Sequence, residues 1–310
     1  MKKCLFLLML SIFVIGCMYS VVDADIGKFE VINHYPDNKV TKMESIGAPE
    51  VIENEILSGM IVGNNYSFES ILSCNELISP FSLADGKGLI FLSNVEPTPY
   101  CQINKIVSSY DFDNGKHIEV GGTGFMVGPG IVVTAAHCIY YDTYEKWPDQ
   151  VRVYVKQNGS VENCKYYTPH SWIIPSEYFK HFNRDYDWAI LTMRENISEK
   201  TGWMGIGYTT DEIINKEITV SGYPGDSKYM GHQCCSKGYM DWDSAYQIRH
   251  TADTLPGQSG GPIFDNDNIT WGIHTHKRDN SNYQYGTRFT MDLYSLLKQK
   301  ISDAVSHYYN

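Results

Sequence analysis

From about residue 115 onward, the chain consists of short apolar runs separated by Gly, Pro, Asn and Asp. The runs are rich in β-branched and aromatic residues, and this composition at this spacing is typical of strands joined by turns. Examples are Thr123–Val127, Ile131–Ala135, Val151–Val155, Trp188–Met193, Ile218–Ser221, Ile263–Phe264 and Ile269–Ile273. The pattern predicts an all-β fold, either a sandwich or a barrel.

The end of the chain departs from this pattern. Leu293, Leu296, Leu297 and Ile301 recur at helical spacing, and Asp292 is placed to cap the start of the helix. We therefore expect one helix to close an otherwise all-β chain.

The composition excludes several classes of protein. The chain has 310 residues, of which 43% are hydrophobic, and this is enough to bury a sizeable core. Its formal net charge of -11 disfavours nucleic acids as partners, because an acidic surface repels phosphates. After residue 22 no apolar run is long enough to span a bilayer.

The N-terminal 24 residues predict export. Lys2 and Lys3 precede the apolar stretch Leu5–Val22, and small residues suit cleavage after Ala24, so residues 1–24 are interpreted as a signal peptide. One alternative is an anchored membrane segment. Another is lipidation of Cys17, because Val14–Cys17 resembles a bacterial lipobox. The expected location is extracellular, with surface anchoring as the variant.

An acidic segment follows. Its charged residues up to position 80 are Asp25, Glu30, Asp37, Glu44, Glu50, Glu53, Glu55, Glu69 and Glu76 against Lys28, Lys39 and Lys42. Residues 25–85 are interpreted as a propeptide whose boundary falls between 80 and 95, which leaves 86–310 as the mature domain. The alternative is an N-terminal extension that stays attached.

Six cysteines lie outside the signal segment. They are Cys74, Cys101, Cys138, Cys164, Cys234 and Cys235. An even number in an exported chain predicts disulfide bonds, whose connectivity the sequence leaves open. No C-x-x-C pair is present, so a zinc site is not expected. Sequons occur at Asn65, Asn158, Asn196 and Asn268.

Two glycine-framed segments carry the residues of nucleophilic catalysis. His137 follows the apolar run 131–133, and Ser259 lies in the tight loop 257–262 with the sequence GQSGGP. An exposed serine needs a base, and its developing oxyanion needs convergent donors. The N–H groups of Gly257 and Ser259 are the candidate donors, and glycine at 257 removes a Cβ that could clash there.

A carboxylate is also needed to orient the imidazole. Asp187 opens the apolar run 188–193 and is the preferred candidate, and Asp185 is the rival. The order His137, Asp187, Ser259 differs from lipase-type and subtilisin-type hydrolases and matches the chymotrypsin arrangement.

The motifs TAAHC, DWAIL and GQSGGP resemble the trypsin-like serine proteases. Residues 122–138, 218–226 and 271–274 and the closing helix are similar to the glutamyl endopeptidase, or V8-like, branch, and the similarity spans about 95–305. The resemblance implies two antiparallel six-stranded β-barrels with a C-terminal α-helix, and a secreted zymogen. It also implies a serine endopeptidase that cuts proteins or peptides. The roles of these residues require no metal or organic cofactor, and although the resemblance allows a structural calcium, the sequence shows no ligand cluster for one. A monomer is expected.

The resemblance also bears on specificity. Thr254 and His274 match residues that grip a glutamate carboxylate in that branch, so cleavage after Glu or Asp is expected. The basic run His274, His276, Lys277 and Arg278 would favour an anionic side chain. The alternative is Asp253, six residues before Ser259, which would select Lys or Arg as in trypsin.

Two further points stay open. Relatives often bridge the cysteine after the histidine to a position that is Gly122 here, so Cys101 and Cys164 are the candidate partners of Cys138. The rival class of function is a non-catalytic protease homologue that acts as a surface binding protein. Such homologues usually lack a triad member, whereas this chain keeps all three.

Overall fold

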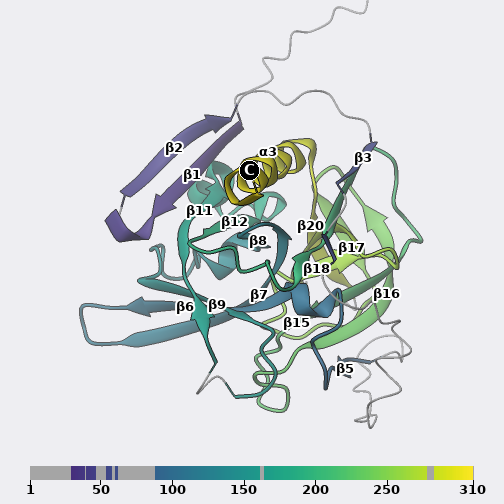
Figure 1. Cartoon of the computed structure of the whole chain (residues 1–310), viewed down its shortest axis with the longest axis horizontal. Coiled ribbons are helices and arrows are strands. Elements are labelled where there is room, and N and C mark those ends of the chain that lie inside the picture. The colour runs from purple at the N-terminus through teal and green to yellow at the C-terminus, as the bar shows by residue number, and fades with distance from the viewer. Residues whose placement is uncertain are drawn as a thin grey trace, which may run out of the picture.

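Figure 1 shows the computed structural model of the chain, which describes residues 29–38, 40–46, 54–57, 60–61, 88–160, 164–277 and 283–309. Two curved sheets form the body, and helix α3 (Met291–Tyr309) lies at one end of it. The predicted signal peptide, Cys17, Cys74 and Asn65 fall outside the described residues.

The first sheet is a curled half-barrel whose strands run in the order β10-β9-β6-β7-β8-β12-β11-β1-β2. Every pairing is antiparallel. Among the described residues no ladder joins β9 to β11, so the curl is not closed by hydrogen bonds. The strands are β1 (Phe29–Tyr35), β2 (Val40–Ile46), β6 (Ile103–Asp111), β7 (His117–Gly128), β8 (Ile131–Thr134), β9 (Gln150–Val155), β10 (Tyr166–Tyr167), β11 (Pro169–Pro175) and β12 (Ala189–Met193).

The second sheet contains a closed barrel of six strands in the order β15-β16-β17-β20-β19-β18, because β18 pairs with both β15 and β19. These strands are β15 (Glu217–Gly222), β16 (Cys234–Asp243), β17 (Gln247–His250), β18 (Pro262–Phe264), β19 (Ile269–Lys277) and β20 (Gln284–Arg288). Three more strands attach to it, namely β3 (Asn54–Leu57), β5 (Ile90–Phe91) and β14 (Gly205–Thr209).

The smaller elements complete the chain. They are the strands β4 (Met60–Ile61) and β13 (Gly202–Trp203), the helix α2 (Ser176–His181), and the 3₁₀ turns η1 (Pro36–Asn38), η2 (Tyr100–Gln102), η3 (Ala136–Cys138) and η4 (Arg184–Tyr186). The predicted class is confirmed: an all-β, chymotrypsin-like body with a C-terminal helix. It is refined in one respect, since one of the two barrels remains open.

The apolar runs are continuous because several strands are buried on both faces. In β8, Val132 packs inside the half-barrel with Ile106 and Trp172. Its neighbour Val133 faces the opposite way, into a core cluster that also contains Leu293 of helix α3. Alternate residues of one strand therefore serve two cores, which explains the absence of a polar face.

Helix α3 buries the predicted stripe, since Leu293, Leu296, Leu297 and Ile301 are all buried. The capping prediction was wrong: the hydroxyl of Thr290, not Asp292, accepts a hydrogen bond from the backbone N–H of Leu293 at 3.3 Å. Asp292 lies in the first turn instead. Among the described helices, none has the length and apolar character that crossing a membrane requires.

The described cysteines form no disulfide. Cys101, Cys138, Cys164, Cys234 and Cys235 are all free, so the predicted bridge from Cys138 to Cys101 or Cys164 is absent. Cys101 lies near Thr98 and the carbonyl of Thr201 instead. Cys138 lies beside Gly122 on β7, where an added Cβ would be 2.6 Å from the cysteine sulfur.

This geometry predicts that Gly122→Cys forms a disulfide with Cys138. The two positions already face each other at the short range that a disulfide needs. Closing a loop of this length should stabilise the fold by about 3 kcal/mol. The check is thermal unfolding with and without reductant, with the bridge identified by peptide mass spectrometry.

Gly121→Cys is the matched control, because a Cβ at 121 meets nothing within 4 Å. That variant should gain a thiol and no reductant-sensitive stability. If Gly122→Cys behaved like the control, the facing of β7 and η3 described here would be wrong.

Candidate active site

His137 and Asp187 form a closely paired couple. The Nδ1 atom of His137 lies 2.7 Å from Oδ2 of Asp187, and the backbone N–H of His137 donates to Oδ1 at 3.0 Å. The carboxylate is only 4% exposed. Both of its oxygens are thus engaged by one residue, which fixes the plane of the imidazole.

The ladder between β8 and β12 creates this contact. Ala189, at the start of β12, pairs with Thr134, at the end of β8. Asp187 lies just before β12 and His137 just after β8, in the turn η3. Because the strands are antiparallel, these two positions project from the same end of the pair.

Burial and pairing act against each other on this couple. Burial alone would lower the pKa of His137, but the adjacent Asp187 carboxylate holds that pKa well above its usual value. Burial alone would likewise raise the pKa of Asp187, but the His137 charge and its two hydrogen bonds keep that pKa below the usual range. The arrangement therefore stabilises an imidazolium, the state that a general base must reach.

Ser259 lies in the loop between β17 and β18, next to the couple. The Sγ atom of Cys138, the residue after His137, donates to the carbonyl of Ser259 at 3.4 Å. The backbone N–H of Thr123 donates to the same carbonyl at 2.8 Å. Hydrogen bonds from Cys138 on η3 and from Thr123 on β7 thus hold the Ser259 loop beside the catalytic couple.

The Ser259 hydroxyl donates to the carbonyl of Thr275 at 2.9 Å. A register shift between His274 and His276 in the β19–β20 ladder leaves that carbonyl outside the pairing. Within the described residues no hydrogen bond joins Ser259 to His137, so the hydroxyl has to rotate about its Cα–Cβ bond to reach the imidazole.

The loop also presents backbone donors. Gly257 has a φ of +98°, and an added Cβ there would lie 2.6 Å from the backbone nitrogen of Gly225, so only glycine fits. Among the described residues, the N–H groups of Gly257 and Ser259 have no acceptor, unlike those of Gln258 and Gly260. Two unused donors two residues apart are what an oxyanion site requires.

The predicted specificity residues lie in the second barrel. The hydroxyl of Thr254 donates to Oε1 of Gln284 on β20 at 2.9 Å, and both side chains are buried. Gln284 was not anticipated, because a lone glutamine in a strand carries no motif. With its oxygen engaged by Thr254, its amide N–H₂ is left as a donor.

His274 on β19 is 3% exposed and lies against a second buried histidine. Its Nδ1 atom is 3.3 Å from Nε2 of His250 on β17. Burial lowers the pKa of His250 to about 3, and burial followed by the neighbouring histidines sets the pKa of His274 well below its usual value. A carboxylate that entered here would meet neutral imidazoles.

Only part of the basic run expected around His274 lies among the described residues. His276 stacks on Tyr285 at a ring distance of 5.4 Å, and Lys277 is exposed. Arg278 falls outside the described residues. The register shift between His274 and His276 in the β19–β20 ladder interrupts the alternation that would otherwise place these two side chains on one face.

Two aspartates were alternatives in the sequence analysis: Asp185 to Asp187 as the partner of His137, and Asp253 to Thr254 and His274 as the specificity residue. Asp185 accepts a hydrogen bond from the side-chain amide of Gln247 at 2.6 Å and does not orient His137. Asp253 is 2% exposed, and its backbone N–H donates to the hydroxyl of Ser236. The first of these findings separates Asp187 from Asp185 by geometry.

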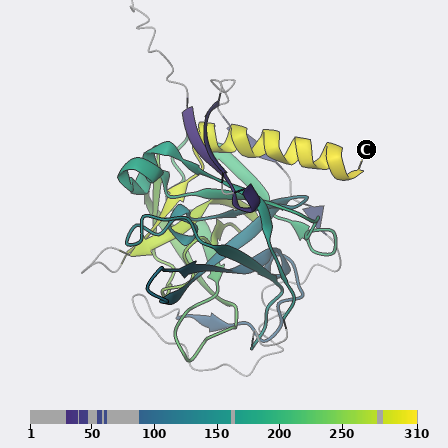
Figure 2. The same ribbon diagram turned by 90° about the vertical axis from the view of Figure 1, so that its left-hand side faces the viewer.

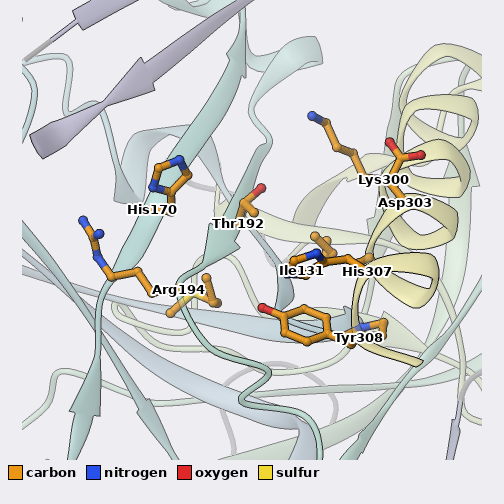
Figure 3. A pocket seen from close by; sticks show the side chains of 12 residues that line it. Ile131, His170, Thr192, Arg194, Lys300, Asp303, His307 and Tyr308 are labelled. Carbon is orange, nitrogen blue, oxygen red and sulfur yellow. The ribbon is translucent and has the colours of Figure 1, made fainter. Parts of the chain in front are cut away.

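A cavity of about 480 Å³ lies elsewhere, between β8, β11, β12 and helix α3. Figure 3 shows Lys300, Asp303 and His307 projecting from the helix toward it, with His170 and Arg194 on the facing side. None of the triad residues lines it. Among the described residues, no group of three or more His, Cys, Asp and Glu side chains could hold a metal ion.

Comparison with known proteins agrees with this geometry. The trypsin family model matches residues 104–294. A glutamyl endopeptidase of Bacillus licheniformis is 31% identical over 190 residues, which cover 56% of this chain and 58% of that protein. An extracellular metalloprotease of Bacillus subtilis is 23% identical over 261 residues, which cover 83% of this chain and 80% of that protein. The matched region thus spans little more than half of the first relative.

Solved structures show the same fold. The structure of a Glu endopeptidase in complex with MPD aligns with a TM-score of 0.60 at 22% identity and covers 71% of this chain and 100% of its own. The protease Anisep from Arthrobacter nicotinovorans aligns with a TM-score of 0.54 at 17% identity, covering 67% of this chain and 98% of its own. With the family model matching well over half of its length, this chain belongs to the trypsin family of serine proteases.

Proposed function

We propose that this chain is a secreted serine endopeptidase that cleaves peptide bonds through an acyl-enzyme and prefers Glu, or Asp, before the scissile bond. The observation that carries the proposal is the His137–Asp187 couple, paired at 2.7 Å beside a serine loop with two unused backbone donors. No single residue of this set is diagnostic, but their assembly from distant segments has a direct chemical use.

The roles follow from the contacts. His137 takes the proton of Ser259 as the hydroxyl leaves Thr275 and attacks the substrate carbonyl. Asp187 stabilises the imidazolium that forms, and the N–H groups of Gly257 and Ser259 hold the oxyanion. His137 then protonates the leaving amine, and water repeats the sequence to release the acyl group. Only side chains and backbone of the chain take part.

The preference for Glu rests on two neutral donors and on a residue that orients one of them. The chain resembles glutamyl endopeptidases, and Gln284 and His274 supply amide and imidazole groups at one end of the second barrel. The hydroxyl of Thr254 holds the side chain of Gln284 in place. A substrate carboxylate that binds there can raise the pKa of His274 by its own charge. Binding of the substrate would then be coupled to protonation of His274. Selection of Lys or Arg through Asp253 remains the alternative specificity.

The proposed organisation has three parts: a signal peptide at 1–24, an acidic propeptide at 25–85 and a protease domain at 86–310. Support comes from the solved Glu endopeptidase, whose whole length aligns to 71% of this chain. Secretion is supported by the extracellular relative and by the N-terminal sequence. Lipidation at Cys17 is the surface-anchored variant of the same proposal, and a monomer is expected.

The nucleophile can be tested by labelling. A fluorophosphonate should modify Ser259 in processed protein, and Ser259→Ala should abolish labelling and reduce peptide cleavage by on the order of 10⁶-fold. Circular dichroism of the variant verifies the fold. If processed, folded wild-type protein were not labelled, a non-catalytic binding protein would be the better description.

The pH profile tests the couple. Since Asp187 raises the pKa of His137, the rise of kcat/KM with pH should have its midpoint above 6.5, and activity should disappear below it as the base becomes protonated. Asp187→Asn should shift this midpoint downward and lower kcat by about 10⁴-fold. An unchanged midpoint in that variant would remove Asp187 from its assigned role.

Specificity is tested with His274→Val. Loss of a hydrogen bond to a charged group should weaken kcat/KM on a Glu substrate by about 10- to 100-fold, while a substrate with Leu at that position is affected much less. His307→Val, on the exposed end of helix α3, is the matched control and should change neither. Equal losses on both substrates, or cleavage after Lys or Arg across a peptide library, would refute the assignment.

A further inference from the structure

The acidic N-terminal segment is built into both sheets. We propose that residues 29–61 are a non-covalent clamp, which stays bound to the protease domain after cleavage near residue 86 and leaves the catalytic site open. The inference takes its cleavage position from the proposed function, but the clamp itself depends only on contacts described below.

The first half of the clamp completes the open half-barrel. Strand β1 adds to the edge of β11 in antiparallel register from Val31↔Pro175 to His34↔Trp172, and β2 pairs along its other side. Without β1, strand β11 would expose a row of unpaired N–H and C=O groups. Strand addition to an exposed edge is a common mode of binding an extended segment. Figures 1 and 2 show this hairpin at the same end of the molecule as helix α3.

The side chains of β1 are buried against the domain. Val31 is completely buried and joins the core cluster that contains Ile190, while Ile32 joins the cluster inside the half-barrel. The ring of His34 stacks on both Trp147 and Trp172, at centroid distances of 4.7 Å and 5.1 Å. These residues are part of the two cores rather than a cover laid over them.

Phe29 extends this packing toward the catalytic couple. Its ring lies 5.8 Å from that of Trp188, the residue after Asp187. The clamp therefore packs against the start of β12, next to the strand end that holds the carboxylate of Asp187.

The second half of the clamp attaches to the other sheet. Strand β3 pairs antiparallel with β14, from Ile206↔Leu57 to Thr209↔Asn54, and Leu57 packs on the main core cluster. Strand β4 pairs with β13. One segment thus pairs with an edge on each side of the molecule.

Three ion pairs between the clamp and the domain agree with the strand register described above. Three carboxylates of the clamp meet three cations of the domain: Glu30 and Lys180 at 3.3 Å, Asp37 and Arg194 at 2.6 Å, and Glu55 and Lys298 at 2.6 Å. These cations lie on or beside α2, β12 and α3. Exposed pairs add little affinity but guide orientation, which gives the acidic composition of this segment a use.

The described residues of the clamp make no hydrogen bond to the catalytic residues. The described hydrogen bonds of His137, Asp187 and Ser259 are all made with residues between 123 and 287. Cleavage anywhere between 61 and 88 would leave every strand pair of the clamp intact. Removal of the covalent link therefore need not remove the segment.

The test uses the full chain carrying Ser259→Ala, with a site for a sequence-specific exogenous protease inserted between residues 62 and 87. After cleavage is verified on a denaturing gel, the two fragments should elute together in size exclusion and appear as a 1:1 complex in native mass spectrometry. Hydrogen exchange at β11 and β14 should stay as slow as before the cut. Separation of the fragments at micromolar concentration would overturn the clamp.

Variants locate the contacts that hold it. His34→Ala and Val31→Asp should speed release of the cut fragment by about tenfold or more, because both residues are buried against the domain. Glu30→Gln, which loses only an exposed ion pair, should change release by less than about twofold. Release rates of His34→Ala and Val31→Asp equal to that of the parent would also refute the clamp.

The outcome is independent of catalysis, because Ser259→Ala has no nucleophile. Separated fragments would leave the proposed peptidase untouched. Conversely, failure of the fluorophosphonate to label Ser259 in the wild-type chain would count against the peptidase and not against the clamp. Fluorophosphonate labelling of a cut wild-type complex, with the fragment still bound, is the result expected if both hold.

Discussion

The antiparallel pairing of β8 with β12 is the constraint on which the site depends. A buried carboxylate is costly unless it is paired and hydrogen-bonded. The ladder meets that condition by bringing the start of one strand beside the end of the other, so that both oxygens of Asp187 are used by His137. Ser259 then needs only a loop anchored to Thr123 and Cys138 to lie in the same place.

The two sheets differ in how the hydrogen-bonding groups of their edge strands are paired. The second barrel closes on itself through β18, whereas the first remains open and accepts β1 at β11. This difference explains why the acidic segment is structured at all. The apolar residues Val31 and Ile32 of this segment are buried against the open edge, and Trp147 and Trp172 provide a surface for the ring of His34.

The fold class was predictable because the apolar runs and their turns are local signals. All seven runs fall in or directly beside strands. The half-barrel that stays open could not be foreseen, since closure depends on pairing between distant strands. The helix cap was misassigned by two residues, since both Thr290 and Asp292 are suitable capping residues.

The site was predictable only in part. Motif order and spacing identified the candidates His137, Asp187 and Ser259, and Asp185 could be separated from Asp187 only by coordinates. Gln284, His250 and the carbonyl of Thr275 carry no sequence signal, because each acts through its place in a ladder. The strands of the acidic segment had a usable signal, namely the turn residues Pro36–Asn38 between two β-rich runs.

Burial of the vicinal cysteines has a consequence for the chemical durability of the protein. Cys234 and Cys235 are fully enclosed, and burial raises the pKa of Cys235 to about 12 and that of Cys234 further. Only the thiolate attacks disulfides or is readily oxidised, so both sulfurs are inert at ordinary pH. Adjacent thiols that would otherwise invite scrambling can therefore persist in oxidising surroundings for as long as the barrel around them stays folded.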